Sequence, residues 1–414
     1  MTVTGCRGFC YNPPMHYLII GGGIAGTTAA ETLRKLAAKC DITIISAERH
    51  PLYSRVMLPH YVSGKTPRER VFLKSPEWYN EQNIHLAFHT VVALEPASKT
   101  VTVDGGHTYS YDKLLIAGGG HVRHLPFDDG HIQHFQTVED ADAIVALIAR
   151  LKNESHPAVG IIGGGFISMD FIKLFAPLGI ATHVFLRNDR YFTPSFDVEM
   201  SHMLTEHLSE HGVVTHLQTE IASWDGSLAK TIGGGALPLH ALTAGVGLIC
   251  QYPWAKEAGV EVGHGIRTNE FLETNIKDVY AAGDCAEFFD VLIERHQQAG
   301  NWLNAQMQGQ HVARVMHGER APFHLVSSYS ATMFGKPVVA VGCARHDVAE
   351  ETVVRDSGDG RTLLFLHRGR LVGASMFNRP DDRAGATKLV EAKVDLSNRH
   401  GELADPEVPL LSLL

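Results

Sequence analysis

The stretch YLIIGGGIAGTTAAETL at residues 17–33 decides the fold expected for this chain. Four apolar residues precede a glycine-rich turn and a helical stretch, a pattern that predicts a strand, a tight turn and a helix. Gly21 would make the turn, Gly23 would let backbone N–H groups approach a phosphate, and Gly26 would let the helix pack close to the strand. Because a helix N-terminus favours negative charge, the stretch predicts a site for the pyrophosphate of a dinucleotide.

The segment that follows supports this interpretation. DITII at residues 41–45 predicts a second strand, which ends near Glu48, about 20 residues past Gly26. An acidic side chain at that place can accept hydrogen bonds from ribose hydroxyls. A lone GxGxxG is weak evidence, since a glycine-rich βα turn without a ligand also shows it. The strand and the acid together favour dinucleotide binding.

A second copy of the pattern, VGIIGGGFISMDFIKLF, occupies residues 159–175. Gly163 and Gly165 are kept, whereas Ser168 replaces the third glycine. The next strand ends on Leu186, where an acid would hold the ribose, and an apolar side chain cannot accept that hydrogen bond. The copy predicts a second dinucleotide-binding unit whose ribose contact differs from that of the first.

Two arginines, Arg187 and Arg190, follow that strand. Guanidinium groups at this place can bind the 2′-phosphate that distinguishes NADP from NAD. They can equally be solvated surface charges, and the sequence leaves both alternatives open.

A third segment, TNIKDVYAAGD at residues 274–284, predicts a short strand, a glycine turn and the carboxylate of Asp284. Taken alone, Asp284 could be a helix cap. Together with the first glycine turn, the segment resembles the T-x4-V-Y-A-x-G-D motif of the FAD-dependent pyridine-nucleotide oxidoreductases. The resemblance covers about residues 15–395 and implies that Asp284 holds the ribityl chain of FAD.

Residues 51–65, PLYSRVMLPHYVSGK, are similar to the branch of this family with rubredoxin reductases, ferredoxin reductases and the flavin module of nitrite reductases. The resemblance implies that Arg55 lies beside the flavin. Many ferredoxin reductases have a lysine five residues later, close to flavin N5, where this chain has His60. We therefore expect no lysine contact from that position.

Two further segments resemble flavin-facing parts of the family. LLIAGGG at residues 114–120 is similar to its A-T-G segment, with Gly118 in place of the threonine. NWLNAQMQGQ at residues 301–310 resembles a helix whose first turn, at Trp302, approaches the pyrimidine end of the flavin. The alternative for Trp302 is packing in the core.

The resemblance implies three catalytic residues: Arg55, His60 and Asp170, which stands where relatives carry a carboxylate near the nicotinamide. No metal site is expected. The residues expected to bind cofactor are, for FAD, Gly21, Gly23, Ile24, Ala25, Gly26, Glu48, Arg55, Val91, Ala117, Gly118, Gly119, Asp284 and Trp302, and, for NAD(P), Gly163, Gly165, Ser168 and Arg187.

Two functions follow from these patterns. The first is an FAD-dependent NAD(P)H oxidoreductase that passes electrons to a protein or small-molecule acceptor without a redox disulfide, since residues 51–60 contain no cysteine. The second is an FAD-bearing electron-transfer subunit of a multiprotein complex with a degenerate nicotinamide site. It is motivated by departures at Ser168, at Leu186 and at residues 247–249, where relatives usually continue a G-x-R-P-N segment.

Composition excludes other classes of protein. The net charge of −9 and the scattered basic residues argue against a nucleic-acid binder. Residues 231–255 lack acidic and basic side chains, but their glycines and prolines predict loops around one buried strand, not a membrane span. Six cysteines without a CxxC pair favour a reducing, cytoplasmic location.

The expected architecture is α/β, with two Rossmann-like dinucleotide-binding domains and a C-terminal α+β interface domain. We assign residues 1–14 to a disordered extension, 15–120 and 243–318 to the FAD domain, 121–242 to the NAD(P)-type domain, and 319–414 to the interface domain and tail. The interface domain is expected to contact a redox partner or a second subunit, in a homodimer or a larger complex. Its leucine-rich tail is expected to dock on its own domain or on a partner.

Overall fold

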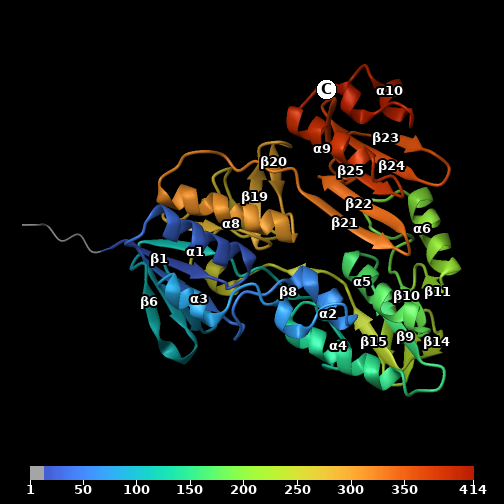
Figure 1. Ribbon diagram of the computed structural model, residues 1–414, viewed down its shortest axis with the longest axis horizontal. Helices are drawn as coiled ribbons and strands as arrows, with labels where there is room; N and C mark the ends of the chain where they lie inside the picture. Colours follow the sequence, from blue (N-terminus) through green and yellow to red (C-terminus); the bar gives the residue numbers. More distant parts are fainter. Residues whose placement is uncertain (1–13) are drawn as a thin grey trace, which may run out of the picture.

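The computed structural model describes residues 14–414, which form three parts in space (Figure 1). Two parts are built on parallel sheets, and the third is built on an antiparallel sheet. The expected α/β class with two Rossmann-like units and a C-terminal α+β unit is confirmed. The prediction of disorder for residues 1–14 falls outside the described residues, apart from Pro14.

The first part contains a parallel sheet in the order β18-β7-β1-β2-β3. Its strands are β1 His16–Ile20, β2 Asp41–Ser46, β3 Ile84–Phe88, β7 Lys113–Ile116 and β18 Val279–Ala281. Two helices distant in sequence, α1 Ile24–Leu36 and α8 Trp302–His317, lie side by side in this part (Figure 1). Because parallel strands share the direction of their carboxyl ends, the loops after β1, β7 and β18 meet at one edge of the sheet.

The second part repeats this plan with a sheet in the order β11-β10-β9-β15. Its strands are β9 Ala158–Ile162, β10 Ala181–Phe185, β11 Val213–His216 and β15 Ala241–Ala244, and its helices are α4 Val138–Leu151, α5 Phe166–Phe175 and α6 Val198–Glu210. All four residues of β15 are buried, so the buried strand expected within residues 231–255 is present. The expectation that only loops surround it was wrong, because this stretch also contains β14 Ala236–Pro238, the short strand Leu248–Ile249 and the start of α7 Pro253–Glu257. Since the expected boundary at 242/243 falls inside β15, we propose that the chain leaves this part after Ala244. No described helix has the length and apolar character needed to cross a bilayer.

The two segments that connect these parts run side by side. The outgoing segment forms β8 His121–Val122, and the returning segment forms β16 Leu248–Ile249. The two strands pair antiparallel, so the chain crosses between the parts through a two-stranded ribbon.

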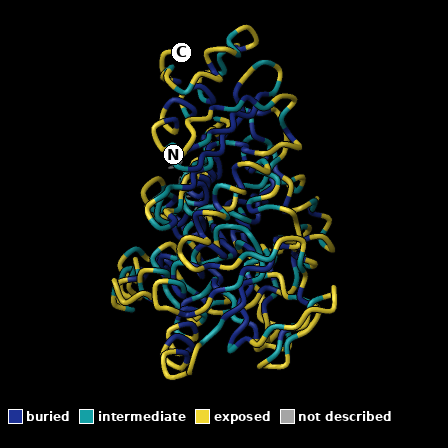
Figure 2. Tube along the Cα trace, turned by 90° about the vertical axis from the view of Figure 1, so that its right-hand side faces the viewer, coloured by how far each residue is buried: buried dark blue, intermediate teal, exposed yellow. Residues whose placement is uncertain are grey.

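The third part is an antiparallel sheet in the order β21-β22-β25-β24-β23, covered by α9. Its elements are β21 Ser328–Met333, β22 Lys336–Gly342, β23 Glu351–Asp356, β24 Arg361–His367, β25 Arg370–Phe377, α9 Asp382–Ala392 and α10 His400–Ala404. The sequence predicts strands at Pro337–Val341, Thr362–His367 and Leu371–Ser375 and a helix at Asp382–Glu391, and β22, β24, β25 and α9 confirm them. Leu410 and Leu413 of the tail are buried against this part, whereas Leu411 and Leu414 are exposed, so the tail docks on its own domain. Figure 2 shows buried residues along the middle of the molecule and exposed residues at its periphery.

Arg355 on β23 fastens the tail to the sheet. Its side chain is 1% exposed and pairs with Asp382 at 3.3 Å between Nε and Oδ2. It also donates to the carbonyl oxygens of Leu403 at 2.7 Å and Val408 at 2.8 Å. A buried guanidinium is stable only when its donors are satisfied, so these bonds tie the last residues to the core.

We expect Arg355→Leu to loosen the tail, because it removes these donors and leaves buried carbonyl oxygens unpaired. The local cost is about 3–5 kcal/mol, as for other broken buried ion pairs. Hydrogen–deuterium exchange of residues 400–414 should accelerate in this variant. The exposed Arg370→Leu on the same sheet is the control, and equal exchange in the two variants would contradict the anchoring role.

Candidate functional site

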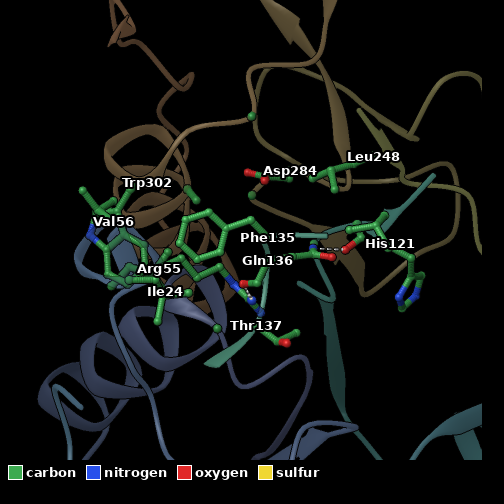
Figure 3. Close-up of a pocket in the computed structure, with 18 of the residues that line it drawn as sticks. Ile24, Arg55, Val56, His121, Phe135, Gln136, Thr137, Leu248, Asp284 and Trp302 are labelled. Carbon is green, nitrogen blue, oxygen red and sulfur yellow. Dashed lines mark hydrogen bonds between the residues drawn. The ribbon is translucent and has the colours of Figure 1, made fainter. Parts of the chain in front are cut away.

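A cavity of about 1160 Å³ lies where the three parts meet. It exceeds the roughly 300–1,000 Å³ of most small-molecule pockets, so it has room for two ligands or one long ligand. Figure 3 shows Asp284, Arg55 and Trp302 among the side chains around this space. Of the residues expected to contact FAD, those that line it are Gly21, Gly23, Ile24, Ala25, Glu48, Arg55, Val91, Ala117, Gly118, Gly119, Asp284 and Trp302.

The first glycine turn forms one wall of the cavity. Gly21 has φ +116°, and a Cβ on it would lie 2.2 Å from the carbonyl oxygen of Ala117. Gly26 does not line the cavity but packs beneath the turn, where a Cβ would lie 2.0 Å from the carbonyl oxygen of Gly21. A Cβ on Gly23, in contrast, would meet no atom within 4 Å, because this residue faces the cavity. The start of α1 therefore presents open backbone to a ligand, which fits a pyrophosphate.

Asp284 supplies the second feature expected of a flavin dinucleotide site, a carboxylate that can accept hydrogen bonds from the ribityl chain. Its side chain lines the cavity and has no protein hydrogen-bond partner within residues 14–414. Burial raises the pKa of Asp284, and the positive charge of Arg55 opposes that shift. Asp284 is half-buried and faces the cavity, so its unpaired carboxylate needs hydrogen-bond donors, and ribityl hydroxyls would supply them. The turn and Asp284 together fit FAD.

Arg55 and Glu48 form one network at this wall. The Arg55 guanidinium donates to the Glu48 carboxylate, to the Tyr53 hydroxyl at 3.0 Å and to the backbone oxygen of Gln136. Tyr53 donates to the other Glu48 oxygen at 2.5 Å. Both Glu48 oxygens are thus engaged, so a ribose contact would have to share them. Tyr53 and Gln136 were not expected, because no spacing in the sequence links them to the glycine turn.

Gly118 and Tyr252 explain one departure from the family pattern. A Cβ on Gly118 would lie 2.5 Å from the hydroxyl oxygen of Tyr252. That hydroxyl donates to the carbonyl oxygen of Gly119 at 3.1 Å. Tyr252 therefore fills the space that a threonine side chain at position 118 would need, and the two residues are complementary.

Asp170, Lys173 and His60 lie at the part of the cavity nearest to the second sheet. The Asp170 carboxylate on α5 pairs with Lys173 at 2.6 Å, and His60, on the short helix α2 Leu58–Val62, is exposed at the cavity wall. Burial raises the pKa of Asp170, whereas Lys173 and His60 oppose the shift. Lys173, three residues after Asp170 on α5, therefore places a cation directly beside this carboxylate. Tyr329, from β21 of the third part, also lines this region.

We expect Lys173→Met to raise the pKa of Asp170 further, because the variant loses the neighbouring cation but keeps the buried carboxylate. If ionised Asp170 orients the nicotinamide, the acidic limb of kcat/KM for NAD(P)H will move to higher pH. The pH profile of flavin reduction measures this shift. Lys152→Met, at the C-terminal end of α4 and outside the cavity wall, is the control, and coincident profiles would exclude the role of Lys173.

The second glycine turn lies outside the cavity wall. Gly163, Gly165, Ser168 and Arg187 do not line it, although α5, which begins at this turn, does. Ser168 is buried, and its hydroxyl has no hydrogen-bond partner in the described part of the chain. Its Oγ lies 3.2 Å from where a Cβ on Gly163 would stand, so the serine side chain packs directly against this turn.

In the second unit, the position where an acidic residue would hold a ribose is apolar. Leu186 is 2% exposed, and its Cδ2 lies 2.7 Å from where a Cβ on Gly164 would stand. Arg190 points elsewhere: its Nε lies 3.2 Å from an Asp189 carboxylate oxygen, and its side chain borders a separate hollow with His346. Arg187 is exposed, so of the two arginines only Arg187 stays available for a 2′-phosphate.

The thiols near this site are inert. Burial raises the pKa of Cys250 to about 11 and that of Cys285 to about 12. Since the thiolate is the reactive form, neither side chain fits a thiol relay. This agrees with electron transfer without a redox disulfide.

We expect Gly21→Ala and Gly23→Ala to fail in different ways. Alanine at position 21 must displace the Ala117 carbonyl at a positive φ, so the protein should lose thermal stability and flavin together. Alanine at position 23 meets no protein atom, so the fold should persist while FAD affinity falls. Thermal unfolding of flavin-free protein and FAD titration separate the two effects, and equal flavin affinity of Gly23→Ala and the parent would contradict the phosphate-binding role.

Comparison with known proteins agrees with this geometry. The model of the pyridine nucleotide-disulphide oxidoreductase family matches residues 15–309, and the reductase C-terminal model matches residues 334–414. A ferredoxin reductase subunit of a 5,5′-dehydrodivanillate O-demethylase from Sphingobium sp. is 28% identical over 97% of this chain and 98% of its own length. Putidaredoxin reductase of Pseudomonas putida is 25% identical over 96% of both chains.

Solved structures show the same fold. The putidaredoxin reductase–putidaredoxin complex matches with a TM-score of 0.89 at 23% identity, covering 97% of this chain and 98% of the other. A ferredoxin reductase from Rhodopseudomonas palustris matches with a TM-score of 0.85 at 22% identity, covering 97% and 99%.

Proposed function

Because the chain belongs to the pyridine nucleotide-disulphide oxidoreductase family, we propose that it is an FAD-dependent oxidoreductase that takes electrons from NAD(P)H and passes them to a redox partner protein. The observation that carries the proposal is one cavity lined by the Gly21 turn, by Asp284 and by Asp170. Bound FAD would supply the redox chemistry, accepting a hydride from the nicotinamide and releasing its electrons to the acceptor. The residues of the chain supply binding, orientation and electrostatics.

The start of α8 supplies part of that electrostatic environment. Trp302 is the first residue of this helix, lines the cavity and is half-buried, and the Asn301 side chain caps the helix by accepting from the backbone N–H of Asn304 at 2.9 Å. A capped helix N-terminus favours negative charge nearby. Placed at the pyrimidine end of the flavin, it would stabilise the reduced cofactor.

Ion pairs beside the cavity reduce the number of cations that can contact an acidic acceptor protein. Lys65, Arg68, Arg70 and Lys74 could have formed a basic patch for an acidic partner. Arg68 is instead paired with Asp142 at 2.8 Å, and Lys74 with Glu31 at 3.2 Å. Lys65 and Arg70 are exposed, and the proposed partner surface rests on these two cations.

A second candidate is an FAD-bearing subunit of a multiprotein complex that no longer binds a nicotinamide nucleotide directly. The buried Leu186 favours it, because an apolar side chain stands where a ribose would be bound. The family match and the named reductases among the relatives favour the first candidate.

The cysteines support a proposal on location. Cys40, Cys250, Cys285 and Cys343 are buried and unpaired, as expected in a reducing compartment. We therefore propose that the protein works in the cytoplasm.

Anaerobic mixing of the flavin-loaded protein with NADH or NADPH distinguishes the two candidates. We expect at least one of them to bleach the flavin absorbance, and Arg187→Ala to weaken reduction by NADPH more than reduction by NADH. Arg383→Ala, an exposed arginine on α9, is the control. An unreduced flavin with both nucleotides would remove the first candidate, and reduction only after adding a partner complex would support the second.

A further inference from the structure

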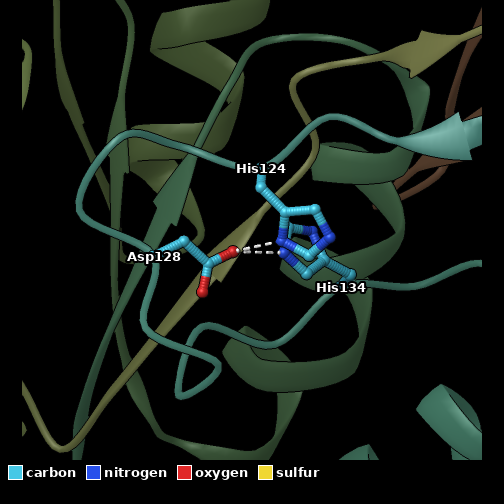
Figure 4. Close-up of side chains that lie close together, drawn as sticks. All are labelled: His124, Asp128 and His134. Carbon is cyan, nitrogen blue, oxygen red and sulfur yellow. Dashed lines mark hydrogen bonds and ion pairs between the residues drawn. The ribbon is translucent and has the colours of Figure 1, made fainter.

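A cluster outside the cofactor chemistry lies on the loop between β8 and α4. His124 Nδ1 and His134 Nε2 each lie 2.8 Å from Oδ2 of Asp128. These two nitrogens and a carboxylate oxygen all lie within 4.8 Å of one another. Figure 4 shows both imidazole rings on the same side of the Asp128 carboxylate, with both interactions directed to one oxygen.

Within residues 14–414, the side chains that contact the Asp128 carboxylate are those of the two histidines. The Asp128 side chain is 0% exposed, and His134 is 10% exposed. The other Asp128 oxygen accepts only the backbone N–H of Gly130 at 3.0 Å, and no lysine or arginine within residues 14–414 pairs with this carboxylate. A buried carboxylate oxygen and two imidazole nitrogens therefore converge on one point, which is the arrangement of a metal-ligand set.

We propose that His124, Asp128 and His134 bind one divalent transition-metal ion, with zinc as the best match. Two imidazole nitrogens and one carboxylate oxygen are a donor set typical of zinc. Ligand atoms around a tetrahedral zinc ion stand roughly 3.3 Å apart, so the 2.8 Å separations need to widen by only about half an ångström. His124 is 64% exposed, which gives the ion a path of entry and leaves a fourth position for water.

Another histidine cluster, on α6, is a poorer site. His207 Nε2 is already bonded to the Met333 carbonyl oxygen at 2.9 Å, and His211 Nδ1 to the His207 carbonyl oxygen at 2.8 Å. Glu210, its third member, is 71% exposed. The imidazoles of the loop cluster, in contrast, direct their nitrogens to one common oxygen.

An ion at this place would fix the loop that leads into the cofactor cavity. His134 itself lines the cavity, as do the residues that follow it, Phe135 and Gln136. Gln136 donates through Nε2 to the Gly120 carbonyl oxygen at 2.5 Å, and its own backbone oxygen accepts from Arg55. The proposed role is therefore structural and does not depend on which nucleotide the enzyme uses. The sequence led us to expect no metal site, because the spacing of the three ligands in this loop matches no short metal motif.

Zinc counting on chelator-treated, flavin-loaded protein tests the site. Parent protein, His124→Ala and the control His131→Ala are incubated with zinc chloride, freed of unbound metal and analysed by mass spectrometry of the metal. We expect the parent and His131→Ala, whose exposed histidine lies in the same loop, to hold one zinc more per chain than His124→Ala. Zinc should also bind His124→Ala at least about tenfold more weakly.

The zinc content must be compared between the parent and its variants, because Cys6, Cys10 and other histidines can also bind zinc. Asp128→Asn gives a second comparison, since it keeps the shape and removes the charge, and it should lose the same equivalent. Cobalt(II) should give visible absorption bands of a low-coordinate site in the parent that are missing from His124→Ala. Equal zinc content in the parent and His124→Ala would overturn the proposal, and so would a parent that retains no zinc.

Discussion

The close approach of two backbone segments at Gly21 is the constraint on which the rest of the structure depends. The turn after β1 passes so near the carbonyl of Ala117 that no side chain fits, and Gly26 brings α1 against the same turn. This contact holds the ends of β1 and β7 together and leaves the start of α1 open toward the cavity. The loop after β18 ends at the same edge of the sheet, which places Asp284 beside the turn. A pyrophosphate site and a half-buried carboxylate thereby share one space, and their distance is set by neighbouring strands of a single sheet.

The departures from the family pattern are matched by changes in their neighbours. Gly118 makes room for the Tyr252 hydroxyl, and Lys173 on α5 pairs with Asp170 at the cavity. On the second unit, Leu186 packs over the glycine turn in place of a ribose-binding acid. The residues expected to contact FAD therefore keep most of the family pattern, whereas those expected to contact the nicotinamide nucleotide depart from it.

Most of the fold could be predicted from local patterns. The glycine turns at Gly21 and Gly163, the strand before Asp284 and the helix at 382–392 all lie where apolar periodicity and turn residues indicate. The site was predicted less completely, because several of its groups arrive through tertiary packing. Tyr53, Gln136, Tyr252 and Tyr329 come from loops and from a different part of the molecule, and no spacing in the sequence links them to the glycine turn. The same reason explains the His124–Asp128–His134 cluster, whose members meet only because the loop folds back on itself.

The central claim is that the Gly21 turn and Asp284 bind one FAD. The most direct measurement is the absorbance spectrum of the purified protein, combined with chromatographic identification and quantification of the flavin released on denaturation. We expect one FAD per chain, either as purified or after incubation with FAD. A colourless protein that stays empty in excess FAD would contradict it.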